Sequence, residues 1–376
     1  MRRALKIRIY PSSEQRDYID GQFGSVRLVY NKALHYISHQ YKFKGCKLNA
    51  KRDAKPLLPI LKKSRRYSFL GNYDCMALQQ ACINLDKAFT NFFEKRAKYP
   101  KFKSKHGSQS SYHTNAKIVE NGIKIPKLSS IISAKIHRQI TGRITSVTLS
   151  KNTLGQYFAS IAYDDDEEIK LLSKNQPIDK IIGIDMGITH FFTDSSGNKE
   201  ANPRFLKKAL KNLKRKQKKL SRTKKGSKGR SKARRLVALA HLRVANARHD
   251  FQHKLSRKLV NENQVIVIET LKVKNMMKNK KLARHIADVS WSSFFTKLEY
   301  KAKEQGSLII KQGQWFASSR LHHCGYKNTT LTLKDRKWDC PKCGTKDIDR
   351  DINAADNLKR AGIVHLKAEG YTVSAH

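Results

Sequence analysis

Acidic residues are scarce in this chain of 376 residues. It has 30 Asp and Glu against 78 Lys and Arg, which leaves a formal net charge of +48. Long apolar runs are also missing, since no stretch approaches the roughly 18 residues of a membrane-spanning helix. The N-terminal segment holds two arginines without the apolar stretch of a secretory signal. We therefore expect an intracellular protein with no membrane partner.

The chain has only six cysteines, which are too few for a disulfide framework at this length. Their scarcity fits a protein of a reducing compartment. Cys46, Cys75 and Cys82 are scattered through the first quarter, and we interpret them as buried or free thiols. Cys324, Cys340 and Cys343 fall close together near the C-terminus. This second group predicts a site of its own.

Apolar and aromatic residues are plentiful enough for packed cores. They make up 39% of the chain, with 15 Phe, 14 Tyr and 3 Trp, which excludes a disordered basic tail. The length suggests roughly two to four domains. The positive charge calls for a polyanion, of which nucleic acid is the usual one. An anionic membrane surface is disfavoured because the basic segments are not confined to one short helix.

The first half of the chain changes its pattern after the helical region. Residues 2–10 alternate basic and apolar side chains, which predicts a half-buried strand. Residues 11–14 indicate a capped helix start, and the pattern stays helical over 14–98. In 99–163, short segments bounded by Gly, Pro, Asn and Ser predict antiparallel strands. The acidic run at 164–168 indicates a boundary.

A strongly basic segment follows two further strands, predicted at 180–185 and 188–194 with a hairpin turn at 195–198. Residues 204–235 hold 17 Lys and Arg and no acidic residue, and a thin row of leucines predicts a helix with one buried face. Such charges repel each other unless phosphates lie nearby, although a solvated helix face is the simpler interpretation. A loop is expected at 223–232 between two helices. The candidates for nucleic-acid binding are Lys207, Lys211, Lys214, Arg215 and Lys218.

Three carboxylates stand at the ends of apolar segments. Asp185 and Glu269 each close an apolar run, and Asp351 opens a helix. Asp349 fits the N-terminal cap of that helix better than the role of a ligand. If the other three converge, they can hold two divalent ions about 4 Å apart, which activate a water for phosphodiester hydrolysis. Oxygen-only ligands favour Mg²⁺ or Mn²⁺.

The clustered cysteines predict a structural zinc site. Cys340 and Cys343 form one complete C-x-x-C-G knuckle, whose partner should be a second C-x-x-C about 12–20 residues upstream. That upstream segment has only Cys324, so one thiolate is missing. His322 or His323 can supply the fourth ligand of a Cys₃His site, with His322 preferred. The alternative is weak zinc binding or none.

Several longer motifs occur in a fixed order along the chain. They lie at 27–34, 78–93, 99–105, 183–198, 265–291, 292–306 and 338–360, and they include the strings GIDMG, VIVIE and WDCPKCG. Together they resemble the three RuvC-type motifs and the zinc insert of the TnpB family. TnpB proteins are encoded by insertion sequences and are relatives of the compact type V CRISPR nucleases. The resemblance covers nearly the full chain.

The resemblance implies an α+β multidomain fold around an RNase H-like, RuvC-type core. The implied parts are a wedge β-barrel domain (1–10 and 99–178), a helical recognition domain (11–98), the nuclease domain (179–315 and 346–362), a zinc-binding insert (316–345) and a C-terminal tail (363–376). It also implies cleavage of double-stranded DNA next to a short flanking motif, guided by an RNA from the element's right end. The implied protein is a monomer carrying one RNA in the prokaryotic cytoplasm.

Carried over position by position, the resemblance assigns two sets of metal ligands. The implied catalytic carboxylates are Asp185, Glu269 and Asp351, and the zinc ligands that match are Cys324, Cys340 and Cys343. The implied cofactors are two Mg²⁺ or Mn²⁺ ions and one Zn²⁺. The fourth zinc ligand does not match, because a residue is missing between Leu321 and His322.

Four further residues are candidates for base contact. By resemblance, Gln79 and Gln80 lie on the helix that faces the target-flanking duplex, and Gln can bind adenine edges bidentately. Tyr30 and Asn31 belong to the same region. An ordinary polar surface or a role in helix packing is the alternative for all four.

Three other functions fit parts of the sequence. A guided DNA-binding regulator would not cut; the three intact carboxylates argue against it, and the shortened knuckle favours it. A transposase that performs strand transfer itself would share an RNase H-like fold. A general RNA-binding protein would explain the charge but not acidic residues at strand and helix ends.

Overall fold

The computed structural model describes residues 1–166, 172–332 and 334–374 of the chain. They form two compact units, Met1–Glu167 and Glu168–His376. The division falls in the acidic run expected to be a boundary, whose last two residues lie outside the described part of the chain. No helix among the described residues is long and apolar enough to cross a membrane.

Unit 1 contains an antiparallel sheet of seven strands in the order β2-β6-β7-β1-β5-β4-β3. Its strands are β1 (Arg2–Tyr10), β2 (Gln109–His113), β3 (Lys117–Val119), β4 (Gly122–Lys124), β5 (Ile132–Ala134), β6 (Arg143–Lys151) and β7 (Tyr157–Asp164). The strands expected at 2–10 and within 99–163 are thereby confirmed. The sheet is curled. Its edges stay open, because among the described strands no pairing joins β2 to β3, the two end strands.

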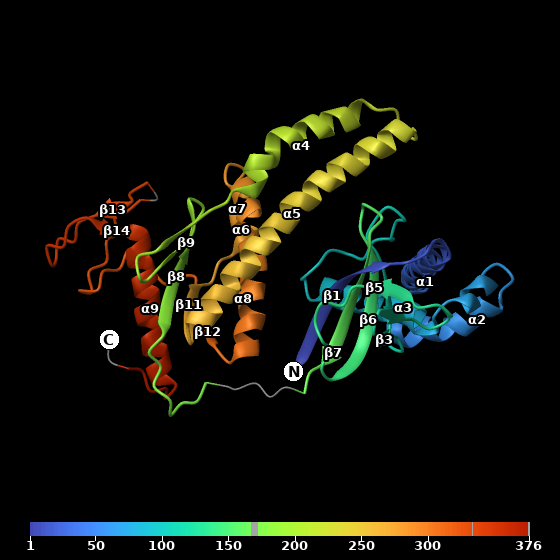
Figure 1. Cartoon of the computed structure of the whole chain (residues 1–376), viewed down its shortest axis with the longest axis horizontal. Helices are drawn as coiled ribbons and strands as arrows, with labels where there is room; N and C mark the ends of the chain where they lie inside the picture. The colour runs from blue at the N-terminus through green and yellow to red at the C-terminus, as the bar shows by residue number, and fades with distance from the viewer. Residues whose placement is uncertain (167–171, 333, 375–376) are drawn as a thin grey trace. The chain divides into compact units, whose positions relative to one another are not determined.

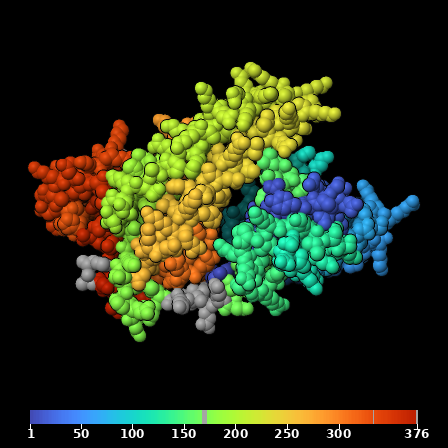
Figure 2. Space-filling model, in the orientation of Figure 1, coloured from blue at the N-terminus to red at the C-terminus, as the bar shows by residue number. Residues whose placement is uncertain are grey.

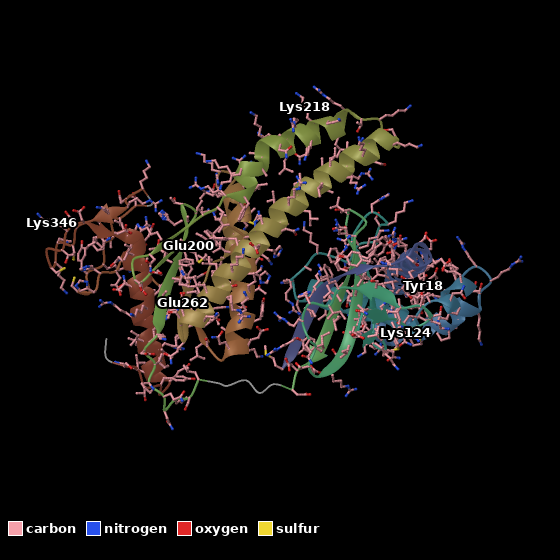
Figure 3. The ribbon with its side chains drawn as sticks, viewed as in Figure 1. Tyr18, Lys124, Glu200, Lys218, Glu262 and Lys346 are labelled. Carbon is pink, nitrogen blue, oxygen red and sulfur yellow. The ribbon has the colours of Figure 1, made fainter. Side chains whose placement is uncertain are left out.

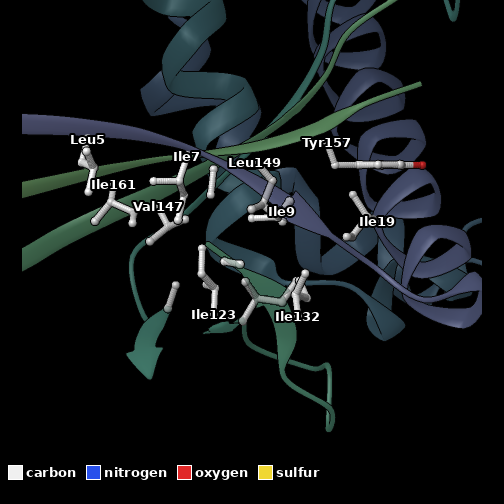
Figure 4. Close-up of a cluster of buried hydrophobic side chains, with 14 of the residues drawn as sticks. Leu5, Ile7, Ile9, Ile19, Ile123, Ile132, Val147, Leu149, Tyr157 and Ile161 are labelled. Atoms are coloured by element: carbon white, nitrogen blue, oxygen red, sulfur yellow. The ribbon is translucent and has the colours of Figure 1, made fainter. Parts of the chain in front are cut away.

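The curl encloses one apolar core. Alternate residues of β1, such as Ile7 and Ile9, are buried, as the period of two dictates. They pack with Val147 of β6 and with Ile123 of β4 and Ile132 of β5, which lie on the other side of β1 in the sheet (Figure 4). Strands on both sides of β1 therefore share one apolar cluster.

Three α-helices lie between β1 and β2 in the sequence. They are α1 (Ser13–Lys44), α2 (Leu58–Lys63) and α3 (Cys75–Phe93), with a π turn at Ala50–Ala54 and 3₁₀ turns at Lys55–Leu57 and Ser68–Asn72. Ser12 caps α1, and Gln15 completes the capping box by accepting from the Ser12 amide at 2.9 Å. The expected capping chemistry is present, with Gln15 as the reciprocal partner.

Unit 2 is built on a five-stranded sheet in the order β10-β9-β8-β11-β12. Its strands are β8 (Ile181–Met186), β9 (His190–Asp194), β10 (Lys199–Ala201), β11 (Val265–Glu269) and β12 (Leu308–Gln312). β8, β11 and β12 run parallel, while β9 and β10 form the hairpin expected at 195–198. The carboxyl ends of the three parallel strands therefore meet at one edge.

Helices cover both faces of this sheet. On one face α9 (Arg350–Ala368) packs its Leu358 against Val267 of β11. On the other face α5 (Lys228–Glu262) and α8 (Trp291–Gln305) pack against Ile266 of the same strand (Figure 1). Burial on both faces explains why β11 is an unbroken apolar run. α9 extends beyond the boundary expected at 362, and the bridge between Ile178 and Val373 places 172–178 in this unit.

A basic helical hairpin extends from the sheet of unit 2. It consists of α4 (Phe205–Arg222) and the N-terminal half of α5, which project away from the sheet (Figures 1 and 2). The loop expected at 223–232 is too long, because α5 already begins at Lys228. Ser227 caps α5, and Arg230 donates to the carbonyls of Leu220 and Thr223 at 3.0 and 2.8 Å. These hydrogen bonds stabilise a short turn between α4 and α5, although the composition of 223–232 is typical of a longer loop.

The remaining elements are short. α6 (Val273–Met276) and α7 (Ala283–Val289) connect β11 to α8, and β13 (Lys337–Trp338) pairs with β14 (Ile348–Asp349) in the segment between β12 and α9. Leu331, Trp338 and Cys340 form the small core of that segment.

Candidate metal centres and nucleic-acid interface

Two of the predicted carboxylates lie on neighbouring parallel strands. Asp185 is the fifth residue of β8, and Glu269 ends β11. Ile184 and Ile268 are partners in the parallel ladder, so Asp185 and Glu269 occupy the next position on adjacent strands. This register brings both carboxylates to the same edge of the sheet.

The third carboxylate comes from the first turn of α9. Asp349 caps this helix, as expected, and accepts from the amide of Asp351 at 3.0 Å. Lys199 of β10 forms an ion pair with Asp349 at 2.5 Å, which ties the helix start to the sheet. Asp351 itself lies 3.5 Å from the guanidinium of Arg336.

A glycine lets α9 lie directly on β8. A Cβ built on Gly183 would lie 2.0 Å from the carbonyl oxygen of Ala355 and 2.6 Å from the amide of Lys359. Any side chain at this position would therefore push the helix backbone off the strand. The absence of a side chain at Gly183 therefore lets α9, the helix that carries Asp351, approach the strand that carries Asp185.

The surroundings of Asp185 are unfavourable for a charged carboxylate. Burial raises the pKa of Asp185 to about 8, and the charges of Glu269 and Asp351 act in the same direction. Arg350 and Arg336 oppose this shift. Burial also raises the pKa of Glu269. Three half-buried carboxylates that repel each other form an all-oxygen donor set, which fits hard divalent cations such as Mg²⁺ or Mn²⁺.

A second candidate centre lies in the segment between β12 and α9. Its ligands are His322, Cys324, Cys340 and Cys343, whose ligand atoms all lie within 4.8 Å of one another. Within the described ranges no other set of three or more His, Cys, Asp or Glu side chains is gathered this closely. The three carboxylates Asp185, Glu269 and Asp351 therefore lie further apart than the ligand atoms of this set. His322 belongs to the set and the alternative, His323, does not.

Three of the distances in this set are close to those of a tetrahedral zinc site. Nδ1 of His322 lies 3.2 Å from Sγ of Cys324 and 3.4 Å from Sγ of Cys343, and Cys324 and Cys340 are 3.5 Å apart. Zinc–sulfur and zinc–nitrogen bonds imply ligand–ligand edges of about 3.3–3.8 Å in a tetrahedron. Hydrogen bonds from Thr345 lower the pKa of Cys343 to about 7, which favours the thiolate that zinc binds. The donor set therefore fits Zn²⁺.

Two asparagines attach this segment to α9. Nδ2 of Asn353 donates to the carbonyl of Leu321 at 2.7 Å. Nδ2 of Asn357, a buried side chain, donates to the carbonyls of Ser318 and Leu321, the former at 2.8 Å. We call the part of the chain between β12 and α9, which contains His322 and the three clustered cysteines, the zinc-type segment. The helix that carries Asp351 thus holds the beginning of this segment.

The basic candidates of α4 form an exposed surface. The exposed side chains are those of Lys207, Lys211, Lys214, Arg215 and Lys218. Lys218 lies near the end of α4 that is distant from the sheet (Figure 3). Leu213 is the buried residue of α4, so a single apolar row faces α5 and the charges face outward. Such a surface suits a phosphate backbone.

The two glutamines of α3 lie at its partly exposed face. Gln79 lines an open hollow of about 370 Å³ together with Lys51, Lys55 and Lys62. Gln80 donates to Asn84, one turn further along α3, at 3.0 Å. Gln79 borders basic side chains, and contact of either glutamine with bases stays a prediction.

Tyr30 and Asn31 are engaged in packing within unit 1. Tyr30 is buried, and the ammonium of Lys103 lies 4.1 Å from the centre of its ring. Asn31 donates to the Lys103 carbonyl at 3.0 Å and accepts from the Lys103 amide at 2.8 Å. These contacts favour a packing role for Tyr30 and Asn31 over contact with bases.

Asp288 is an anchor that the sequence did not reveal. Its carboxylate accepts from the amides of Leu206 and Lys207 at the start of α4 and from Arg248 of α5 at 3.0 Å. It therefore caps α4 from a distant part of the chain and joins the two helices of the basic hairpin to α7. A cap supplied across 80 residues leaves no local sequence signal.

Family models match three parts of the chain. The family described as "Probable transposase" matches residues 160–280, "Cas12f1-like, TNB domain" matches 291–358, and "Helix-turn-helix domain" matches 1–46. The second match spans the zinc-type cluster and Asp351. In the structure, the third region holds β1 and the single long helix α1.

Full-length relatives are also known. A protein of Streptomyces pristinaespiralis named "Putative RNA-guided DNA endonuclease" is 38% identical, with 96% of this chain and 90% of that one covered. A protein of Escherichia coli K12 named in the same way is 28% identical over 96% and 92% of the two chains. The solved Cas12f1–sgRNA–target DNA complex has the same fold, with a TM-score of 0.56 at 13% identity and coverage of 96% and 98%. The chain belongs to the TnpB family.

Proposed function

We propose that this protein is an RNA-guided DNA endonuclease of a transposable element. It would cut double-stranded DNA next to a short flanking motif. The observation that supports the proposal is that Asp185 and Glu269 end adjacent parallel strands, while Asp351 at the start of α9 is near enough that its charge, with that of Glu269, adds to burial in raising the pKa of Asp185. A full-length relative with 38% identity, named as an RNA-guided DNA endonuclease, supports it.

The three carboxylates would hold two Mg²⁺ or Mn²⁺ ions. When bound, such a pair activates a water and stabilises the leaving oxygen of a phosphodiester. The protein's own contribution is placement. Parallel register fixes Asp185 beside Glu269, and the Asp349 cap and Lys199 fix the first turn of α9 that carries Asp351. Ligands held on rigid elements need less rearrangement when the metal ions and substrate arrive.

We assign the other parts of the chain to the nucleic-acid partners. The curled sheet of unit 1 would be the wedge domain, the helices α1 to α3 the recognition domain, and the sheet of unit 2 a RuvC-type core. The segment with His322 and the three cysteines would bind one structural Zn²⁺. The guide would be an RNA from the element's right end, bound by one protein monomer. The net charge of +48 supports binding of a folded RNA and a DNA backbone together.

The first test is to purify the protein from cells that carry its native locus and to sequence the RNA bound to it. One abundant RNA with a constant structured part and a 3′ segment matching sequence beside the element is expected. A mixture of ribosomal and transfer RNA would refute guiding.

The second test is cleavage of a plasmid that carries the matched target. Glu269→Gln should abolish cutting while RNA and DNA binding persist, because it removes a metal ligand and not a nucleic-acid contact. Glu262→Gln is a matched control, since Glu262 is an exposed residue at the end of α5. Cutting by Glu269→Gln with Mg²⁺ present would refute the metal assignment. Target DNA that the wild type binds but leaves uncut would favour a guided regulator.

A further inference from the structure

Trp315 is the most exposed large apolar side chain in the described part of the chain. It is 88% exposed, whereas the two other tryptophans, Trp291 and Trp338, are 2% and 7% exposed. Single exposed apolar residues are common on proteins, so exposure alone assigns no role. The position of Trp315 relative to the carboxylates provides the second observation.

Trp315 follows the strand next to Glu269. β12 pairs with β11 up to Gln312, which is the ladder partner of Glu269, and the Thr270 amide donates to the Gln312 carbonyl at 3.0 Å. Adjacent strands lie about 4.8 Å apart, and three further residues span at most about 10 Å. The Trp315 backbone therefore lies within about 15 Å of the Glu269 backbone, at the same edge of the sheet.

The loop that carries Trp315 is fixed on both sides. Phe316, the next residue, packs into the core between the sheet and α9, and its amide donates to the Gly313 carbonyl at 3.0 Å. Two residues further on, Ser318 is held by Asn357 of α9. The backbone of Trp315 is therefore held in place, so that binding a ligand has only the side chain to order.

We propose that Trp315 stacks on an unpaired base of the DNA strand that is cut and so positions that strand over the carboxylates. This inference rests on the proposed function. An indole offers a large flat surface, and stacking on it accepts any base, which suits a nuclease whose sequence choice lies elsewhere. Trp315 is a positioning residue, since the carboxylates hold the reacting phosphate.

Intrinsic fluorescence tests the contact without cleavage. The full-length protein is titrated in EDTA with a single-stranded oligothymidine, and binding is followed separately by anisotropy of a labelled oligonucleotide. Stacking should quench the emission of exposed tryptophan, which is red-shifted relative to that of the two buried ones. Trp315→Phe should remove the quenching while binding persists. Unchanged wild-type emission at saturating oligonucleotide would overturn the proposal.

Cleavage kinetics test the positioning role. Trp315→Ala should raise KM for the target by roughly 5- to 150-fold, the range for loss of one stacked base, with a smaller change in kcat. Trp315→Phe should recover most of the loss because it keeps a ring, and Val364→Ala, at a 68% exposed site on α9, should behave as wild type. Equal KM values for wild type and Trp315→Ala would overturn the positioning role alone. Absence of cutting by the wild type would instead refute the proposed function, and the fluorescence result would still stand.

Discussion

Replacing Gly183 by alanine would place a methyl group where α9 crosses β8. The new Cβ would lie 2.0 Å from the Ala355 carbonyl oxygen, which is backbone and cannot rotate away. The helix must therefore move outward by about 1 Å to restore a van der Waals separation. Overpacking of this kind costs about 1–3 kcal/mol of unfolding free energy. The same movement displaces Asp351 from Asp185, and a 1 Å misplacement lowers catalytic rates by about 100-fold.

Urea unfolding and single-turnover cleavage would measure the two effects. Gly229→Ala is the matched control, because Gly229 lies in α5, where a Cβ meets only ordinary contacts. There alanine should stabilise the protein by about 0.5–1 kcal/mol and leave cutting unchanged. Wild-type stability and wild-type cutting by Gly183→Ala would refute the view that this glycine sets the separation of the carboxylates.

Three further outcomes are expected. In EDTA, stability should fall as pH rises from about 4 to about 8, because the raised pKa of Asp185 lets the folded protein bind more protons than the unfolded chain over that range. Asp185→Asn should flatten this dependence in urea unfolding, and a flat wild-type curve would contradict it. Metal analysis should give about one zinc per chain, with the content lowered by His322→Ala and kept by His323→Ala; the reverse pattern would exclude the ligand set. Asp288→Ala should cost about 1–3 kcal/mol in thermal or urea unfolding, because it leaves two helix amides and Arg248 unsatisfied. Asp250→Ala, which loses only an exposed pair with Lys254, should cost less than about 1 kcal/mol; equal effects of these two changes would contradict the anchoring role of Asp288.

Sequence patterns predicted the features that depend on neighbours along the chain. Asp185 and Glu269 each close an apolar run, and parallel buried strands must end at a common edge, so their adjacency follows from the pattern. Asp349 was predicted as a helix cap because the carboxylate and the helix start adjoin in sequence, and the structure confirms it. The hairpin between β9 and β10 followed from its turn residues in the same way.

The features that were missed depend on contacts between distant residues. Arg230 shortens the loop before α5 by binding carbonyls of the preceding helix, which composition cannot reveal. Tyr30 and Asn31 have the chemistry of a base-contact pair, but their partner is Lys103, more than 70 residues away. The role of Asp288 has the same origin. For polar residues whose partners are remote in sequence, local patterns do not identify those partners.

Both ends of the zinc-type segment are attached near the N-terminal end of α9. Asn353 and Asn357 hold its beginning at Ser318 and Leu321, and its last strand leads directly into the cap of α9. Its two ends are therefore fixed close together, so a change in length between them costs little closure entropy. For protein engineering, the segment is an exchangeable cassette: versions from relatives can be grafted between the same two anchor points while the cutting residues keep their geometry.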